Sequence, residues 1–150
     1  MIVVGIDPGK NGALAVIDGR DLIRIIPFKG DIGLCRLAPY EVHADHIFLE
    51  RVTASPQQGV VSAFTFGKYS EAVESASLLN RSCPLVHAVR PSAWQGALGC
   101  LTGGDKQITY DFAKSRFPKE YEKKLFNKES ADAVCIAWYG VLAVTYGEKK

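Results

Sequence analysis

The chain of 150 residues is 47% hydrophobic and 23% charged, with a formal net charge of +2 at pH 7. A chain of this length fits one domain of ordinary size and buries enough surface to fold without a metal or disulfide staple. Its near-average composition excludes collagen-like, low-complexity and broadly disordered proteins, and we expect a single domain over residues 1–150.

The strands predicted from apolar, β-branched runs come mainly in the first third of the chain. Tight turns containing Gly separate the first three runs, which predicts an antiparallel meander. Two further strands are expected, and a helical pattern lies between them. The five predicted strands cover residues 2–6, 12–18, 22–28, 46–52 and 85–89.

The predicted helices follow apolar residues that recur at helical spacing. A short helix is expected within residues 29–44, and longer or better defined ones are predicted at 60–81, 92–98, 105–117 and 129–146. Strands followed by alternating helices and strands predict an α/β fold, with one mixed sheet covered by helices on both faces.

The longest uncharged stretch, residues 133–147, is shorter than the ~20 residues of a membrane-spanning helix. We therefore expect no membrane partner. None of the four cysteines forms a C-x-x-C pair, which argues against a zinc site. No secretory signal precedes Asp7, so we expect reduced thiols in a cytoplasmic protein.

Asp7 ends the first apolar run, within Gly5-Ile6-Asp7-Pro8-Gly9. An aspartate before Pro-Gly is common at the start of a turn, and this explanation stays open. A carboxylate at the carboxyl end of a buried strand is also partly desolvated, which favours a metal ion or a specific partner. The apolar run before Asp7 favours this second interpretation.

Glu50 lies inside the fourth predicted strand. Alternation along a strand puts it on the same face as the apolar Phe48 and Val52. A surface pair with Arg51 is the alternative, but neighbours in a strand point to opposite faces. The pattern favours a buried, functional carboxylate.

Glu129 and Asp132 are expected to open the last helix, where their spacing puts both carboxylates on one helix face. Acids in a first turn often only complement the helix dipole. The residues that follow are apolar on nearly every face of the helix, which predicts that this helix is buried and that its leading carboxylates point inward.

Four carboxylates from two strands and a helix would repel one another and raise their own pKa values if they met uncompensated. Divalent cations relieve this repulsion, and oxygen ligands without Cys or His suit Mg²⁺ or Mn²⁺. Two such ions can stabilise both the attacking and the leaving oxygen of a phosphodiester displacement.

This pattern resembles the RuvC family of Holliday junction resolvases, within the RNase H-like superfamily. The resemblance rests on Gly5-Ile6-Asp7-Pro8-Gly9 after a strand, the strand-borne Glu50, and Glu129-Ser130-Ala131-Asp132-Ala133, and it extends from Ile2 to about Gly140. It implies an RNase H-like sheet of five strands, in which the first three are antiparallel and the fourth and fifth run parallel to the first.

The resemblance also implies a homodimer that resolves four-way (Holliday) DNA junctions by paired symmetric nicks, leaving 5′-phosphate and 3′-hydroxyl ends. Asp7 would bridge two Mg²⁺ or Mn²⁺ ions, and Glu50 would ligate the ion at the leaving 3′ oxygen. Glu129 and Asp132 would complete the ligand set, with metal-bound water as the nucleophile.

Two features depart from the bacterial branch of the family. Glu129 stands where those members typically have Asp, and residues 52–58 lack the aromatic side chain thought to wedge into the junction. The compact interval between Asp7 and Glu50 looks more like phage-encoded relatives, which would act in the cytoplasm of a host cell.

Lys106 follows the Gly103-Gly104 turn, and the resemblance suggests a basic residue here near the scissile phosphate; a solvated lysine at a helix start is the alternative. Further candidates for contacts with the DNA backbone are Lys10, Arg51 and Lys68.

The predicted helix at 60–81 occupies the position of the family's dimer interface. We expect Phe64, Phe66 and Val73 to contribute to that interface, because the helix is apolar over more than one stripe. The alternative is that these side chains pack on the chain's own sheet.

Three other functions are alternatives to a junction resolvase. A phosphate-binding module of the sugar-kinase or actin type is disfavoured because it needs two domains, whereas this chain has room for one. The sequence also contains no phosphate-binding G-x-x-x-x-G-K-[ST] loop. A non-catalytic DNA-structure binder is disfavoured because all four expected acids are present, whereas a related nuclease acting on flaps, forks or RNA–DNA hybrids stays open.

The small net charge does not argue against DNA. Residues 51–128 carry 11 basic and 6 acidic side chains, a net +5, and the proposed catalytic acids lie in the two acidic segments on either side. If metal ions neutralise those acids, the remaining surface is basic enough for phosphate binding with a steep salt dependence.

Overall fold

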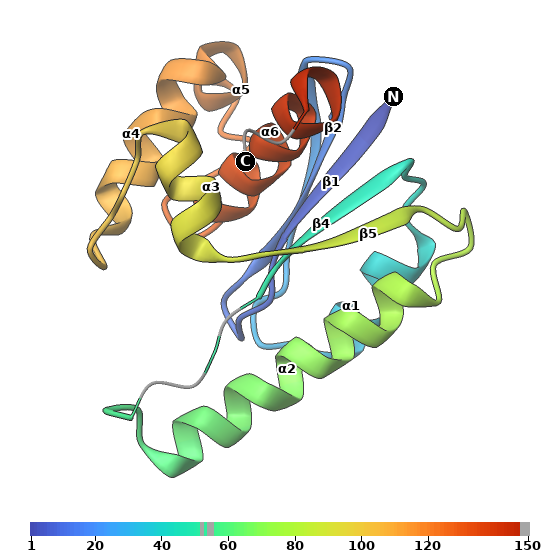
Figure 1. Ribbon diagram of the computed structural model, residues 1–150, viewed down its shortest axis with the longest axis vertical. Helices are drawn as coiled ribbons and strands as arrows, with labels where there is room; N and C mark the ends of the chain where they lie inside the picture. Colours follow the sequence, from blue (N-terminus) through green and yellow to red (C-terminus); the bar gives the residue numbers. More distant parts are fainter. Residues whose placement is uncertain (52, 54–55, 148–150) are drawn as a thin grey trace.

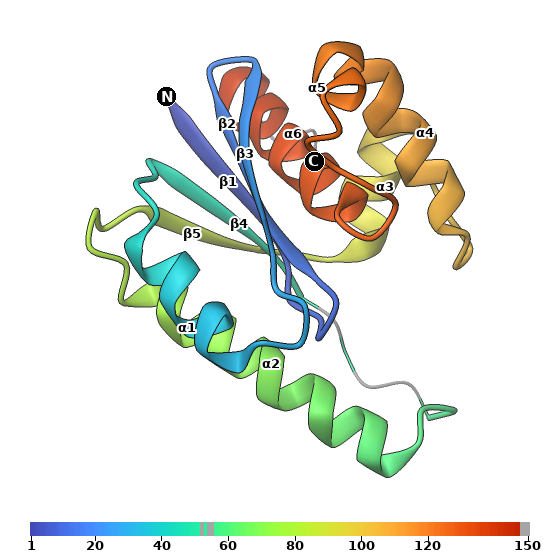
Figure 2. The same cartoon turned by 180° about the vertical axis from the view of Figure 1, so that it is seen from behind.

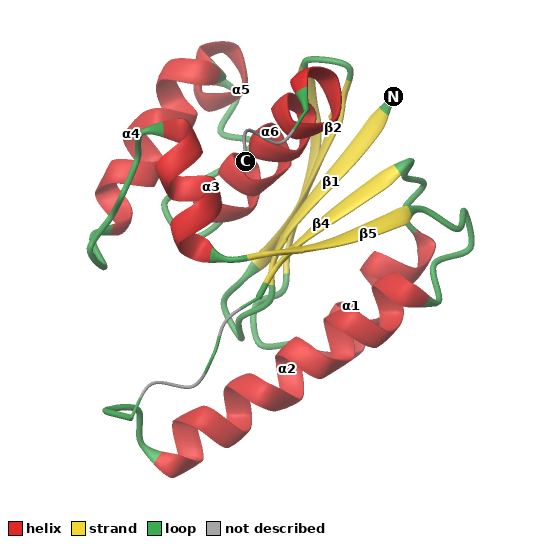
Figure 3. Ribbon diagram, in the orientation of Figure 1, coloured by secondary structure: helices red, strands yellow, loops and turns green. Residues whose placement is uncertain are grey.

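The computed structural model describes residues 1–51, 53 and 56–147. Its strands form one five-stranded sheet in the order β3-β2-β1-β4-β5, drawn in yellow in Figure 3. The strands are β1 (Ile2–Asp7), β2 (Ala13–Asp18), β3 (Asp21–Pro27), β4 (His46–Glu50) and β5 (Leu85–Val89).

The pairing confirms the predicted mixed sheet. β2 runs antiparallel to β1 and β3, whereas β4 runs parallel to both β1 and β5. Because β1, β4 and β5 point the same way, their carboxyl ends meet at one edge of the sheet. Asp7 and Glu50 end two of these strands and are therefore brought to that edge.

Six helices in the described part of the chain cover the sheet on both faces (Figures 1 and 2). α1 and α2 pack on one face, and α6 packs on the other against β1, β2 and β4, with α3 and α4 beside it. The helices are α1 (Ile32–Glu41), α2 (Val60–Leu78), α3 (Pro91–Leu98), α4 (Lys106–Arg116), α5 (Pro118–Glu122) and α6 (Ala131–Tyr146).

α6 lies unusually close to the sheet because glycines stand at its contacts. A Cβ on Gly5 of β1 would clash with the backbone of Ala133 and Ala137, and one on Gly140 would clash with the Phe48 ring and Val3. The missing side chains let the helix backbone rest directly on β1 and β4. The first turn of α6 is thereby held near the carboxyl ends of these strands.

Two predicted helix boundaries were wrong, and one helix was not predicted. α2 ends at Leu78 rather than at 81, since the Asn80 side chain donates to the carbonyl groups of Pro39 (2.7 Å) and Val42 (2.8 Å) and ties the chain to the end of α1. α5 lies in a charged stretch that the sequence pattern left unassigned. The last helix begins at Ala131, two residues later than predicted.

The prediction that Val73 contributes to a dimer interface is wrong. Its side chain is fully buried and packs in the core between α2 and the sheet. Phe66 is half-buried, whereas Phe64 is 78% exposed. The amino-terminal part of α2 extends past the sheet, as Figure 1 shows, which leaves Phe64 with Val60 and Val61 in solvent.

All four cysteines are free, and three of them, Cys35, Cys100 and Cys135, are buried while Cys83 is exposed. Among the described residues, no helix is both long and apolar enough to cross a membrane.

Candidate active site

Asp7 is the last residue of β1 and pairs with Ala13 of β2. The connecting turn is tight: the N–H of Gly12 donates to the carbonyl of Gly9 (3.0 Å), and a Cβ on Gly12 would clash with the Asp7 carbonyl. This turn fixes the Asp7 backbone at the sheet edge. The pKa of Asp7 is raised from 3.8 to about 6, mainly because the side chain is buried and secondly because the Asp132 carboxylate is near.

Glu50 ends β4 and is only 9% exposed. The indole Nε1–H of Trp94 in α3 donates to its Oε1 at 2.9 Å. Burial, then repulsion by Asp7, raise the pKa of Glu50 to about 7, although the Trp94 hydrogen bond acts in the opposite direction. The burial of Glu50 that strand alternation predicted is therefore confirmed.

Asp132 lies in the first turn of α6. The Thr109 hydroxyl donates to its Oδ1 at 2.6 Å, and Lys106 Nζ lies 3.7 Å from Oδ2. Both partners come from α4, which packs along α6. Asp132 is thus oriented on both carboxylate oxygens by a neighbouring helix.

Asp7, Glu50 and Asp132 form the group that we call the carboxyl cluster. The Asp132 charge raises the pKa of both Asp7 and Glu50, and the Lys106 charge lowers both. Three chain segments far apart in sequence therefore bring their acids close enough to repel one another, with one lysine partly compensating. Buried repulsion of this kind is relieved by protons or by cations.

Glu129 does not join the carboxyl cluster in this structure. It lies in the turn before α6 and is exposed, contrary to the expectation that both acids of the last motif point inward. The Asn127 Oδ1 accepts the backbone N–H groups of Glu129 and Ser130, each at 3.0 Å. Because of this capped turn, α6 begins two residues later than predicted, and Glu129 lies outside the helix at the rim of the carboxyl cluster.

The oxygen donors of the carboxyl cluster fit a divalent cation. Carboxylates whose pKa values are raised by mutual repulsion gain most from a positive ion, and hard oxygen ligands suit Mg²⁺ or Mn²⁺. Within the described residues, no three His, Cys, Asp or Glu side chains already enclose a site tight enough for a metal ion.

The predicted basic residues fall in different places. Lys106 lies at the carboxyl cluster with its side chain 50% exposed. Arg51 is exposed just after Glu50, and Lys10 lies on the β1–β2 turn with its side chain along Gly30. Lys68 is exposed in the middle of α2, on the face of the sheet opposite α6 (Figure 2).

Trp94 and Thr109 were missed from the sequence. Trp94 is completely buried, and its indole would be taken for a core residue of α3. Thr109, also fully buried, is three residues after Lys106, one helical turn away and on the same face. A hydroxyl side chain one helical turn after a candidate site lysine was the available signal for Thr109.

No known family model matches the sequence, and no curated protein matches it. The structure is similar to solved structures, among them two at 19% sequence identity. One is a Thermus thermophilus RuvC structure, with a TM-score of 0.69 over 99% of this chain and 98% of that chain. The other is T. thermophilus RuvC in complex with Holliday junction substrate, with a TM-score of 0.63 over 98% and 97%. The chain therefore has a RuvC-like, RNase H-like fold, as the resemblance implied.

Proposed function

We propose that this chain is a divalent-metal-dependent endonuclease that resolves four-way DNA junctions, working as a cytoplasmic homodimer. The observation that carries the proposal is the carboxyl cluster, which lies at the shared edge of β1 and β4 within a RuvC-like fold. One of the similar structures is a RuvC in complex with Holliday junction substrate, which supports branched DNA as the substrate class.

Asp7, Glu50 and Asp132 would hold the metal ions, with Glu129 as a fourth ligand at the rim. Two Mg²⁺ or Mn²⁺ ions would supply Lewis-acid stabilisation of the charge that develops on the phosphate and would lower the pKa of an attacking water. The cleavage would leave 5′-phosphate and 3′-hydroxyl ends.

The chain's own residues position these ligands. Trp94 holds one oxygen of Glu50, and Thr109 holds one oxygen of Asp132. Because both donors are buried, the carboxylates keep their orientation without reorganising solvent, which is what preorganised electrostatic catalysis requires. Lys106 presents a half-exposed ammonium beside Asp132, where it would contact the scissile phosphate.

Lys10, Arg51 and Lys68 would contact the DNA backbone away from the reacting phosphate. All three side chains are exposed. Contacts of this kind fix the register of the DNA and carry no sequence information.

A homodimer would supply the two active sites that paired nicks require. The apolar side chains best placed to form its interface are Val60, Val61 and Phe64, which are 86%, 80% and 78% exposed. Three large apolar side chains in one exposed segment are typical of an interaction site. Phe66, half-buried beside them, would lie at the margin of this interface.

The decisive experiment compares cleavage of a synthetic four-way junction, a Y-fork, a flap, a linear duplex and an RNA–DNA hybrid, with Mg²⁺ and with Mn²⁺. We expect preferential, symmetric cutting of the junction. Equal cutting of the junction and the duplex would exclude a resolvase, and preferential cutting of the hybrid would identify a different RNase H-like nuclease.

Asp7→Asn is the matched active-site control. It keeps the side-chain volume but removes the charge, so it should abolish metal-dependent cleavage while leaving junction binding largely intact. Full activity in this variant would refute the assignment of the site.

A further inference from the structure

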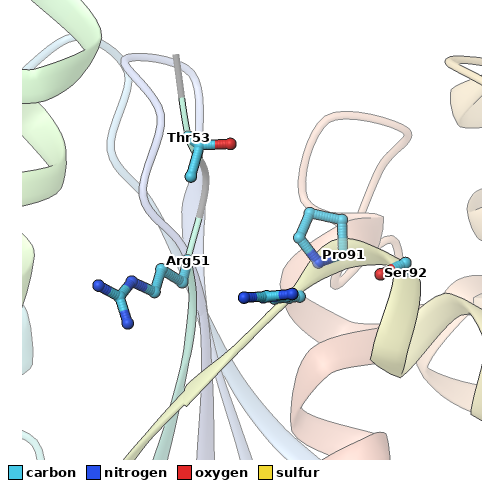
Figure 4. Close-up of a pocket in the computed structure, with 5 residues that line it drawn as sticks. Arg51, Thr53, Pro91 and Ser92 are labelled. Atoms are coloured by element: carbon cyan, nitrogen blue, oxygen red, sulfur yellow. The ribbon is translucent and has the colours of Figure 1, made fainter. Parts of the chain in front are cut away.

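A hollow of about 660 Å³ opens at the carboxyl ends of β4 and β5, beside the start of α3. We call it the arginine hollow. Figure 4 shows Arg51, from the end of β4, on one side and Pro91 and Ser92, from the start of α3, on the other. Its described lining residues are Arg51, Thr53, Arg90, Pro91 and Ser92.

The two arginines are neighbours across adjacent strand ends. Glu50 pairs with Val89, and the N–H of Arg51 donates to the Val89 carbonyl at 2.7 Å. Arg51 is thus the first residue after β4, and Arg90 is the first residue after the adjacent strand β5. Two like charges at adjacent strand ends repel one another. Both side chains are exposed, and the ion pairs found among the described residues include neither guanidinium.

Two arginines that line one hollow favour an anion there. An arginine presents a planar fork of N–H donors that matches phosphate oxygens, and the hydroxyl of Ser92 is a further donor at the opposite wall. The described lining contains no acidic side chain that would compete with an anion.

We propose that the arginine hollow binds one backbone phosphate of the DNA substrate, close to the scissile linkage but distinct from it. The hollow and the carboxyl cluster share α3, since Ser92 lines the hollow and Trp94 donates to Glu50. A DNA strand whose scissile phosphate lies at the carboxyl cluster would therefore place a neighbouring phosphate near the hollow. The proposal rests on the proposed function and adds Arg90, a residue with no expected role from the sequence, to its binding surface.

The test measures binding of a four-way junction in Ca²⁺, which prevents cleavage confounding the measurement, at several salt concentrations. The proteins are the wild type, Arg51→Gln, Arg90→Gln and the double variant. Arg81→Gln is the matched control, because Arg81 is exposed and precedes the amino end of β5, at the opposite edge of the sheet.

If both arginines hold a single phosphate, each single variant weakens binding about tenfold. The double variant then costs clearly less than the product of the two single effects, and its salt slope falls by about 1 rather than about 2. Arg81→Gln leaves affinity and slope unchanged.

A methylphosphonate scan of the junction strands locates the phosphate. We expect one linkage, other than the scissile one, at which the neutral replacement weakens binding by the wild type but not by the double variant. The proposal is overturned if no such linkage exists, or if the arginine variants bind like Arg81→Gln while the wild type still cuts junctions. A wild type that neither binds nor cuts branched DNA would instead overturn the proposed function, and this proposal with it.

Discussion

The indole Nε1–H of Trp94 donates a 2.9 Å hydrogen bond to Oε1 of Glu50, a carboxyl group that is only 9% exposed. Since the donor is fully buried in α3 and the acceptor ends β4, this bond joins the α6 side of the core to the edge of the sheet. It favours the ionised form of Glu50, the form that binds a cation.

Trp94→Phe therefore should raise the pKa of Glu50 above its present value of about 7. We expect the acid limb of the pH–rate profile to move to higher pH and cleavage at neutral pH to fall about tenfold. Trp138→Phe removes an indole from the other end of the same core and is the control. Equal profiles for the wild type and Trp94→Phe would show that the bond does not position Glu50.

The metal-free protein should lose stability as the pH rises. The folded-state pKa values of Asp7 and Glu50, about 6 and about 7, lie above the ordinary 3.8 and 4.5, so the folded state retains protons that the unfolded chain releases. Their contribution is fully present below about pH 4 and is lost as the pH passes through 6 to 7, a loss of roughly a few kcal/mol in total.

Urea unfolding in EDTA between pH 5 and 8 measures this effect. Asp7→Asn should flatten the decline, and Mg²⁺ should restore the stability of the wild type at pH 8 because the ion replaces the lost protons. A decline that is the same in Asp7→Asn and unaffected by Mg²⁺ would contradict a metal site at the carboxyl cluster.

Asp132→Asn and Glu129→Gln should both abolish Mg²⁺-dependent cleavage, but for separable reasons. Of these two acids, Asp132 is among the causes that raise the pKa values of Asp7 and Glu50, and Glu129 is not. Asp132→Asn should thus lower those two pKa values in the metal-free protein, as followed by carboxyl NMR, whereas Glu129→Gln should leave them in place. Undiminished cleavage by Glu129→Gln would remove Glu129 from the ligand set.

Phe64→Glu should give a folded monomer. The side chain is 78% exposed, so a charge there does not disturb the core, but it would be buried in the proposed dimer. Light scattering measures the mass, and Leu85→Glu, at an exposed apolar residue of the edge strand β5, is the control. A dimeric Phe64→Glu protein would place the interface elsewhere.

Gly5→Ala should destabilise the protein and weaken metal binding together. The added methyl group meets the backbone of Ala133 and Ala137, which cannot rotate away, so α6 must shift from β1. We expect a loss of about 1–3 kcal/mol in the free energy of unfolding. Gly59→Ala is the control, because Gly59 also has an extended backbone but nothing lies within 4 Å of an added Cβ. Unchanged stability in Gly5→Ala would show that the helix contact is looser than described.

The sequence could predict the sheet because its strands are marked by apolar runs and Gly turns. It could predict Asp7 because that residue ends such a run, and Glu50 because it alternates with apolar residues on one strand face. It could not reveal Trp94 or Thr109, whose roles depend on how α3 and α4 pack against β4 and α6. It mistook Val73 for an interface residue, since a helix apolar on two sides does not indicate which side meets the sheet.

The last helix shows the same limit at one boundary. The three-residue spacing of Glu129 and Asp132 fits one helical turn. The Asn127 side chain, however, accepts the N–H groups of Glu129 and Ser130, and the helix starts only at Ala131. A side chain two or three residues upstream therefore separates two acids that a helical pattern alone would have kept together.

Cys83 differs from the other cysteines in a way that is useful at the bench. It is exposed while Cys35, Cys100 and Cys135 are buried, and it lies before the amino end of β5, whereas the carboxyl cluster and the arginine hollow lie at the opposite edge of the sheet. A maleimide dye should therefore react at Cys83 without any engineered cysteine. A dye at Cys83 would thus report the binding of DNA by the unmutated protein while leaving the carboxyl cluster unmodified.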